Sequence, residues 1–188
     1  MTATAPGQSA QLLDDVVPVL GRLRISYVVI GAMAASFYGA VRSSLDADVA
    51  LALQRTDPKL SALVERLKIL GTAVTRRAGD SRDPIAELIS VEDRHRNRVD
   101  LLIGIRGMDP AAFSRAVHSS VEGHRLAIVG LEDFIAMKVA AGGPKDVADV
   151  RGVLTVSRKQ LNLKLLRLLT ARYGTSTLKT LDALLTND

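Results

Sequence analysis

The chain has 188 residues, of which 47% are hydrophobic and 3% aromatic, so it can form one domain with a core of Leu, Val, Ile and Ala. It contains no cysteine, which excludes disulfides, zinc–thiolate sites and cysteine nucleophiles, and no apolar run reaches the ~18 residues of a membrane span. The formal net charge of +5 suits a polyanionic partner, although ordinary solubility explains it equally well.

The amino-terminal segment, MTATAPGQSA, has neither the basic nor the apolar stretch of a signal peptide. Residues 1–9 are therefore predicted to be a disordered tail, and the protein is expected to be cytoplasmic, with no membrane partner. Residues 11–23 carry Leu and Val on one helical face, and Pro18 is expected to kink or shorten this helix.

Further along the chain, short apolar runs alternate with amphipathic segments, and mainly helical patterns follow Gly130. This order predicts an α/β (α+β) protein: a mixed sheet flanked by helices in a core of residues 10–130, with a C-terminal helical region, residues 131–188, packed on it. Strands are expected over 27–30, 49–53, 72–75, 85–91, 98–105 and 126–129, and helices over 32–39, 58–70, 110–117, 131–141, 145–155, 159–170 and 175–185.

Two carboxylates, in Asp46-Ala-Asp48, open the second strand. Successive side chains on a strand point to opposite faces, so Asp46 and Asp48 share one face and lie roughly 6–7 Å apart along the chain. Two like charges side by side are costly unless a cation lies between them. A hard divalent cation such as Mg²⁺ is the obvious candidate.

A third carboxylate, Asp100, lies within the apolar run Arg98-Val-Asp-Leu-Leu-Ile. An ionised Asp in such a strand is costly unless it is paired or bound to a metal. Arg98, two residues earlier on the same face, offers an ion pair. Completion of a two-metal site with Asp46 and Asp48 is the alternative, and the carboxylate pair already present favours it.

Gly31 marks the point where the first strand ends and a helix begins. Backbone N–H groups at such a turn form an anion site suited to phosphates. A strand, a Gly and a helix are weakly specific alone, and the carboxylates that follow give the pattern its weight.

Three motifs thus follow one another between residues 27 and 150. The first is a strand, a small-residue pair and a short helix that lead to two carboxylates, the second is one carboxylate on a later strand, and the third is a helical Lys followed by Asp-x-x-Asp. They read Gly31-Ala32, Arg42-Ser-Ser44-Leu and Asp46-Ala-Asp48 for the first, Asp100 for the second, and Lys138-Val-Ala-Ala141 with Lys145, Asp146 and Asp149 for the third.

In this order the motifs resemble the minimal nucleotidyltransferases of the DNA polymerase β superfamily, and most of all the AbiEii/AbiGii-type toxins of bacterial toxin–antitoxin systems, which include MenT-like enzymes. The resemblance implies a polymerase-β-like core that transfers NMP from an NTP to an acceptor hydroxyl and releases pyrophosphate. It implies two Mg²⁺ ions, or Mn²⁺, on the catalytic residues Asp46, Asp48 and Asp100, with Lys138 neutralising the triphosphate. The basic charge favours RNA as acceptor, with the tRNA 3′ end as the leading case, and a cognate antitoxin as a partner.

The resemblance also implies nucleotide binding at eight positions, several of which have a second explanation. Arg42 either contacts a phosphate or pairs with Asp46. Ser44 either supplies a hydroxyl to the phosphate or stabilises a turn. The helical Asp side chains either orient Lys138 or a substrate base, or pair with Lys145 on the helix surface. The small residue after Gly31 is often Ser in the family, so Ala32 removes a hydroxyl from the phosphate turn. The eight positions are Gly31, Ala32, Arg42, Ser44, Lys138, Lys145, Asp146 and Asp149.

The predicted RNA-binding residues are Arg94, Arg96 and Arg98, in and beside a charged turn without aromatic residues. This composition suits phosphate contacts and does not support base stacking, and a solvated charged turn is the alternative. Two other functions remain open: the same chemistry on a protein or antibiotic hydroxyl, and a catalytically degenerate binding or antitoxin-like module.

Overall fold

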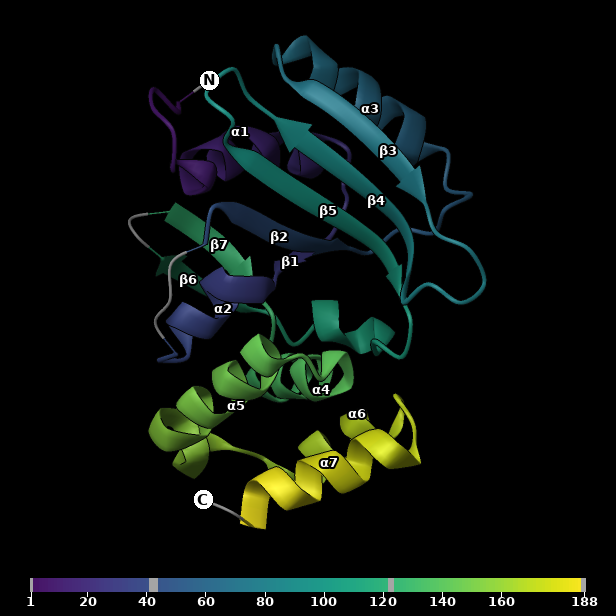
Figure 1. Cartoon of the computed structure of the whole chain (residues 1–188). Helices are drawn as coiled ribbons and strands as arrows, with labels where there is room; N and C mark the ends of the chain where they lie inside the picture. Colours follow the sequence, from purple (N-terminus) through teal and green to yellow (C-terminus); the bar gives the residue numbers. More distant parts are fainter. Residues whose placement is uncertain (1, 41–43, 122–123, 187–188) are drawn as a thin grey trace.

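The computed structural model describes residues 2–40, 44–121 and 124–186, and its centre is a mixed seven-stranded sheet (Figure 1). The strand order is β3-β4-β5-β2-β1-β7-β6, with β2 parallel to β5, β1 parallel to β7 and the other pairs antiparallel. The predicted fold class is therefore confirmed. The strands are β1 Tyr27–Val29, β2 Asp46–Leu51, β3 Ala73–Ala78, β4 Ile85–Glu92, β5 Arg98–Ile105, β6 Val117–Val121 and β7 His124–Ile128.

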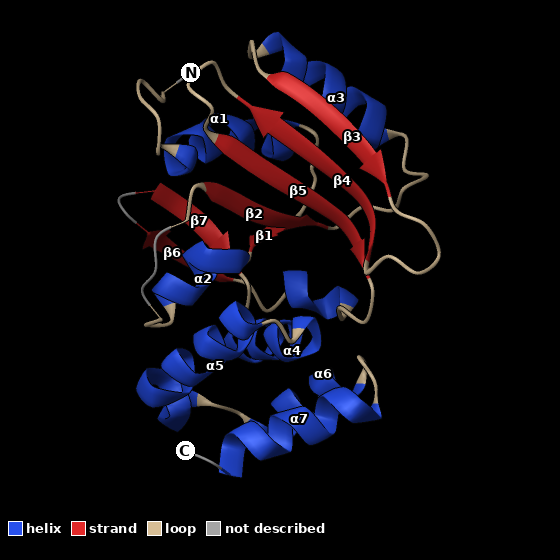
Figure 2. Cartoon of the chain, viewed as in Figure 1, coloured by secondary structure: helices blue, strands red, loops and turns tan. Residues whose placement is uncertain are grey.

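Helices lie on both faces of the sheet, and a further helical layer lies to one side of it. In Figure 2, α1 and α3 lie behind the sheet, α2 lies in front of it, and α4 to α7 form a layer below. No helix among the described residues is long and apolar enough to cross a membrane. The helices are α1 Ser9–Arg22, α2 Gly31–Phe37, α3 Lys59–Ile69, α4 Leu131–Ala141, α5 Pro144–Ser157, α6 Leu163–Ala171 and α7 Thr175–Thr186, with 3₁₀ turns η1 Pro110–Phe113 and η2 Arg158–Gln160.

The hydrophobic core fixes which face of β2 and β5 remains open. Val49 and Leu101 are fully buried, as is Leu12 on the inner face of α1. Because side chains alternate along a strand, the neighbours of these residues point the other way, toward the open face. The carboxylates of β2 and β5 therefore lie opposite the face that α1 and α3 cover.

Several element boundaries differ from the sequence prediction. Helix α1 continues through Pro18 to Arg22. Strand β3 extends to Ala78, beyond the predicted end at residue 75, because its backbone pairs with β4 along its whole length. Strand β6 was not predicted, and it forms a hairpin with β7. Backbone pairing with a partner strand supplies hydrogen bonds that the sequence pattern of one strand does not reveal.

Residues 2–9, expected to be disordered, make defined contacts with the turn between β4 and β5. The Asn97 side chain donates to the carbonyl oxygen of Ala5 at 2.9 Å and accepts from the backbone N–H of Gln8 at 2.7 Å. Ala3 is buried. The amino-terminal segment thus ends against the strands that carry the candidate site.

Candidate active site

The three candidate carboxylates lie on one face of two neighbouring strands. β2 and β5 run parallel, with Asp48 opposite Asp100 and Asp46 opposite Arg98. Adjacent strands are about 4.8 Å apart, so Asp48 and Asp100 are side by side. The structure therefore brings together the three residues that strand alternation placed on one face.

Arg98 lies among these carboxylates. Its Nε is 2.8 Å from Asp100 Oδ1, and its Nη2 donates to Ser90 Oγ at 3.0 Å. The hydrogen bond to Asp100, together with the negative charge of Asp100 and then of Asp46, raises the pKa of Arg98, although partial burial opposes this shift. The ion pair left open by the sequence is thus present, and it places Arg98 within the carboxylate cluster.

The donor set suits Mg²⁺ in part. Asp48 and Asp100 offer hard oxygen donors in register on adjacent strands, which is the chemistry Mg²⁺ takes together with water and phosphate. Within residues 2–40, 44–121 and 124–186, no three His, Cys, Asp or Glu side chains form a group that could hold a metal. Arg98 holds Asp100 Oδ1, so a metal ion at that oxygen would compete with this ion pair. The residues fit Mg²⁺ by the chemistry of their oxygen donors, and the remaining ligands would have to come from water and phosphate.

Gly31, the first residue of α2, packs directly on Asp48. Its φ of +64° is in the left-handed region, and a Cβ at this position would overlap Asp48 Oδ2. The backbone N–H of Ile30 donates to the carbonyl oxygen of Asp48 at 2.9 Å, which ties the end of β1 to β2. Only glycine therefore allows the start of α2 to lie this close to a candidate catalytic carboxylate.

Replacing Gly31 with Ala is expected to lower the free energy of unfolding by about 2 kcal/mol and to displace Asp48. Gly71→Ala is the matched control, because Gly71 has a φ of +78° but open space where a Cβ would lie. The control should lose about 1 kcal/mol, from backbone strain alone. Urea denaturation measures the free energy of unfolding of both variants. Equal losses would show that the overlap with Asp48 does not destabilise the fold.

The other residues of the first motif divide into three cases. Arg42 lies outside the described residues. Ser44 is exposed, and its Oγ donates to the carbonyl oxygen of Asp46 at 3.0 Å, which is the turn role that the sequence left open. Ala32 is 3% exposed on the inner side of α2, so its methyl group is part of the packed interior.

The third motif forms an ion cluster that joins α4 to α5. Lys138 Nζ is 2.7 Å from Asp146 Oδ1 and 2.8 Å from Asp149 Oδ2. Gly142 ends α4 with a left-handed φ, and α5 begins at Pro144, so the chain turns back and brings the acidic residues onto Lys138. Lys145 is exposed. In this structure the two acidic residues orient Lys138, and the triphosphate role implied for Lys138 stays a prediction.

Two of the predicted RNA-binding residues, Arg94 and Arg96, are exposed in the turn between β4 and β5. Buried Asp93 organises this turn, because its carboxylate accepts hydrogen bonds from the backbone N–H groups of His95 and Asn97, at 2.7 and 3.0 Å, and from the Asn97 side chain. Burial raises the pKa of Asp93, but these hydrogen bonds outweigh it and hold that pKa below its ordinary value. The turn thus presents two guanidinium groups on a hydrogen-bonded base, and Arg96 Nη1 lies 3.8 Å from Glu92 Oε1.

The lowered pKa of Asp93 predicts a pH-dependent contribution to stability. A carboxyl with a depressed folded-state pKa stabilises the fold above its unfolded pKa of about 3.9, and this stabilisation is lost as the pH falls through the folded-state value. Asp93→Asn should therefore cost about 2 kcal/mol at pH 7 and progressively less below about pH 4. Glu65→Gln, at a side chain 68% exposed, is the control and should change little at either pH. If the difference in free energy of unfolding between Asp93→Asn and the wild type does not become smaller in acid, the stabilising role of the Asp93 carboxylate is wrong.

Two serines that no sequence motif indicates support the site. Ser9 Oγ donates to the carbonyl oxygen of Leu45 and accepts from the backbone N–H of Arg98 at 3.1 Å. It thereby bridges the beginnings of β2 and β5, directly beside Asp46. Ser90 orients Arg98 from β4. A Ser before an amphipathic segment is a signal for a helix start, but its contacts with distant strands leave no sequence pattern.

No protein-family model matches the chain, and no curated protein matches it. Solved structures do match its fold. The crystal structure of ANT(2″)-Ia in complex with adenylyl-2″-tobramycin superposes with a TM-score of 0.61 at 15% identity, covering 88% of this chain and 96% of that one. The chain has a nucleotidyltransferase fold.

Two further solved structures agree with this assignment. The solution structure of ANT(2″)-Ia gives a TM-score of 0.61 at 13% identity, over 96% of this chain and 98% of that one. A nucleotidyltransferase-like protein from Paracoccidioides brasiliensis gives 0.54 at 13% identity, over 97% and 94%. These likenesses extend over nearly the whole chain, so the C-terminal helices belong to the shared architecture together with the sheet.

Proposed function

We propose that this protein is a metal-dependent nucleotidyltransferase that transfers NMP from an NTP to an acceptor hydroxyl and releases pyrophosphate. The observation that supports this most is the row of Asp46, Asp48 and Asp100 on the open face of parallel strands β2 and β5. Carboxylates gathered in one place favour binding of a divalent cation, in addition to the partner that Arg98 already provides for Asp100. The nucleotidyltransferase fold of the chain also supports the proposal.

The carboxylates and Arg98 have complementary parts in the proposed reaction. Bound Mg²⁺ would neutralise the triphosphate and make the attacking hydroxyl more acidic. Asp46 and Asp48 hold the nucleotide end of the site, and Asp100, once released by Arg98, accepts the proton of the acceptor hydroxyl. The acceptor oxygen forms a bond to the α-phosphorus as the bond from that phosphorus to pyrophosphate breaks. Arg98 then lies where negative charge gathers on the phosphates.

We propose RNA as the acceptor, with the 3′ end of tRNA as the leading case. The net charge of +5 and the exposed arginines Arg94 and Arg96, in the turn that leads directly to Arg98, support this choice. The resemblance to AbiEii/AbiGii-type toxins extends the proposal to a toxin of a bacterial toxin–antitoxin system, with an antitoxin as partner. Such a protein would act in the cytoplasm, where NTPs and tRNA occur together.

A small-molecule acceptor is the second candidate. The fold likeness to ANT(2″)-Ia, solved with adenylyl-2″-tobramycin, favours an antibiotic hydroxyl. An aminoglycoside is a polycation, and its recognition requires carboxylates that are available to the ligand. The two candidates share their chemistry and differ in the surface next to the carboxylates.

One labelling panel tests the proposal. Purified protein is incubated with Mg²⁺ and each NTP in turn, labelled on the α-phosphate, together with total tRNA, an aminoglycoside mixture or no acceptor. Label on tRNA, lost in an Asp46→Ala variant, is the expected result. Label on the aminoglycosides would support the second candidate. If no acceptor is labelled and Mg²⁺ with NTP produces no thermal stabilisation, the protein is a degenerate module and the proposal is wrong.

A further inference from the structure

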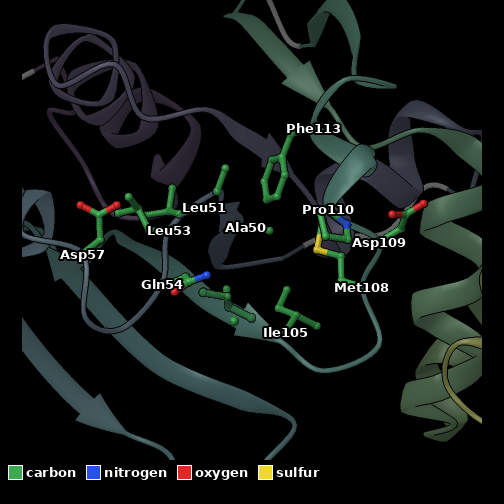
Figure 3. Close-up of a pocket in the computed structure, with 13 residues that line it drawn as sticks. Ala50, Leu51, Leu53, Gln54, Asp57, Ile105, Met108, Asp109, Pro110 and Phe113 are labelled. Carbon is green, nitrogen blue, oxygen red and sulfur yellow. The ribbon is translucent and has the colours of Figure 1, made fainter.

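An open recess of about 470 Å³ lies at the carboxyl ends of β2 and β5 (Figure 3). Ala50, Ala52 and Leu102 line it, and strand alternation places them on the same face as Asp48 and Asp100. With a rise of about 3.3 Å per residue, the recess begins roughly 7 Å beyond the carboxylates. It therefore continues the candidate active site along the sheet.

Small residues create the depth of this recess, and apolar side chains form its walls. Ala52 is exposed at this point and leaves space that a larger side chain would fill, whereas Ala50 is buried beneath it. In Figure 3 the ring of Phe113 extends toward Ala50, and Met108 approaches from the loop after β5. An aromatic ring and a polarisable thioether around a shallow floor suit a flat, apolar group. Ligand pockets of comparable volume accommodate groups of this kind.

The two carboxylates at the edge of the recess are already engaged. Asp57 Oδ1 accepts the backbone N–H of Lys59 at 2.9 Å, at the start of α3. Asp109 Oδ2 is 3.0 Å from Arg115 Nη2, and the pKa of Asp109 is lowered, first by the hydrogen bond from the Ala111 backbone and then by Arg115. These groups serve the fold, and a polycationic acceptor would have to compete for them. The recess therefore disfavours an aminoglycoside.

Two arginines border the same end of the sheet. Arg55 follows the recess residue Gln54, and its Nη1 donates to the carbonyl oxygen of Gly79 at 3.4 Å. Arg106 follows the recess residue Ile105, and its Nη2 donates to the carbonyl oxygens of Ser81 and Asp83, at 2.5 and 2.9 Å. Carbonyl acceptors orient a guanidinium group but do not neutralise it. Both side chains therefore offer positive charge to a phosphate chain that leaves the recess.

Building on the proposed function, we propose that the recess binds the terminal nucleobase of the RNA acceptor. The base lies over Ala52 against Phe113, so its ribose hydroxyl reaches Asp100, and the preceding phosphates pass Arg55 and Arg106. Base stacking on aromatic side chains tolerates any base, because every base has a π-face. Ala52 is the exposed position at which a larger side chain would fill the recess and exclude the base.

Equilibrium binding tests this assignment without requiring catalysis. A short single-stranded RNA with a fluorophore at its 5′ end is compared with the same RNA whose last nucleotide is abasic, by fluorescence anisotropy. Wild-type protein should bind the abasic RNA about tenfold more weakly. Ala52→Leu fills the recess and should bind both RNAs equally, at the weaker level. Ala73→Leu makes the same change at an exposed position of β3 and should behave as the wild type.

A second variant of the recess, at Phe113, provides an independent test. Phe113→Leu removes the stacking ring and should also abolish the discrimination, so the test does not depend on one variant. Equal binding of the two RNAs by the wild type, or full discrimination by Ala52→Leu, would overturn the assignment. The labelling panel on the same proteins separates the two proposals: discrimination in binding without nucleotide transfer would reject the enzymatic activity and retain the recess as a base-binding site.

Discussion

Replacing Asp48 with Asn is expected to reduce nucleotide transfer by roughly a thousandfold, because it removes a charge from the centre of the carboxylate row. Asp48 is in register with Asp100 on the neighbouring strand and contacts the start of α2 through Gly31. Asn keeps the shape of the side chain and removes its charge. Transfer should therefore fall far more than the melting temperature does, because the shape of the side chain is kept.

Glu92→Gln is the matched control for this variant. It makes the same carboxylate-to-amide change in β4, opposite Arg98, at a side chain 38% exposed. Its transfer rate should stay within a few-fold of the wild type, and it should keep the thermal stabilisation by Mg²⁺ and NTP that Asp48→Asn loses. Comparable transfer rates of the Asp48 and Glu92 variants would show that Asp48 is not a catalytic residue.

Lys138→Met is expected to have the largest effect on stability, about 3 kcal/mol. Lys138 is 11% exposed and lies within 2.8 Å of both Asp146 and Asp149, and the Asp149 side chain is only 3% exposed. Met preserves the volume of the side chain but leaves buried negative charge without its cation. For a chain of this length, the melting temperature should fall by about 6–12 °C, which calorimetry measures directly.

Lys145→Met provides the comparison, because Lys145 is exposed on the same helix as the two carboxylates. Its melting temperature should lie close to that of the wild type. The double variant Lys138→Met/Asp149→Leu should recover part of the loss, since the uncompensated charge is removed with its partner. If Lys138→Met has the same melting temperature as the wild type, the cluster does not hold α4 and α5 together, and the triphosphate role of Lys138 gains support.

The part of the site that depends on a single strand could be predicted from sequence. Alternation along β2 places Asp46 and Asp48 on one face of the strand. In β5 the same alternation places Asp100 on the face opposite the buried apolar residues, which is the open face of the sheet. These are local rules, and the core on the opposite face enforces them. Gly31 could be assigned to the junction between the first strand and the helix in the same way, because a glycine between an apolar run and a helical segment is a local signal.

The parts that depend on contacts between distant segments could not be predicted. The motif left open whether Asp146 orients Lys138, because this contact depends on the chain reversal between α4 and α5, whose angle is set by tertiary packing. Ser9 lies in a segment with the composition of a tail, yet hydrogen bonds to β2 and β5 fix its position. The recess has no sequence motif, because small side chains define it only when neighbouring strands align.

The ion pair between Arg98 and Asp100 has a consequence for how activity should vary with pH. A guanidinium group keeps its proton at every pH used in an assay, and the neighbouring carboxylates raise the pKa of Arg98 further. Arg98 therefore keeps its positive charge throughout the usual assay range. A rate that changes within that range would report on another group of the site or on the substrates. Arg98 itself would act as a fixed positive charge beside Asp100.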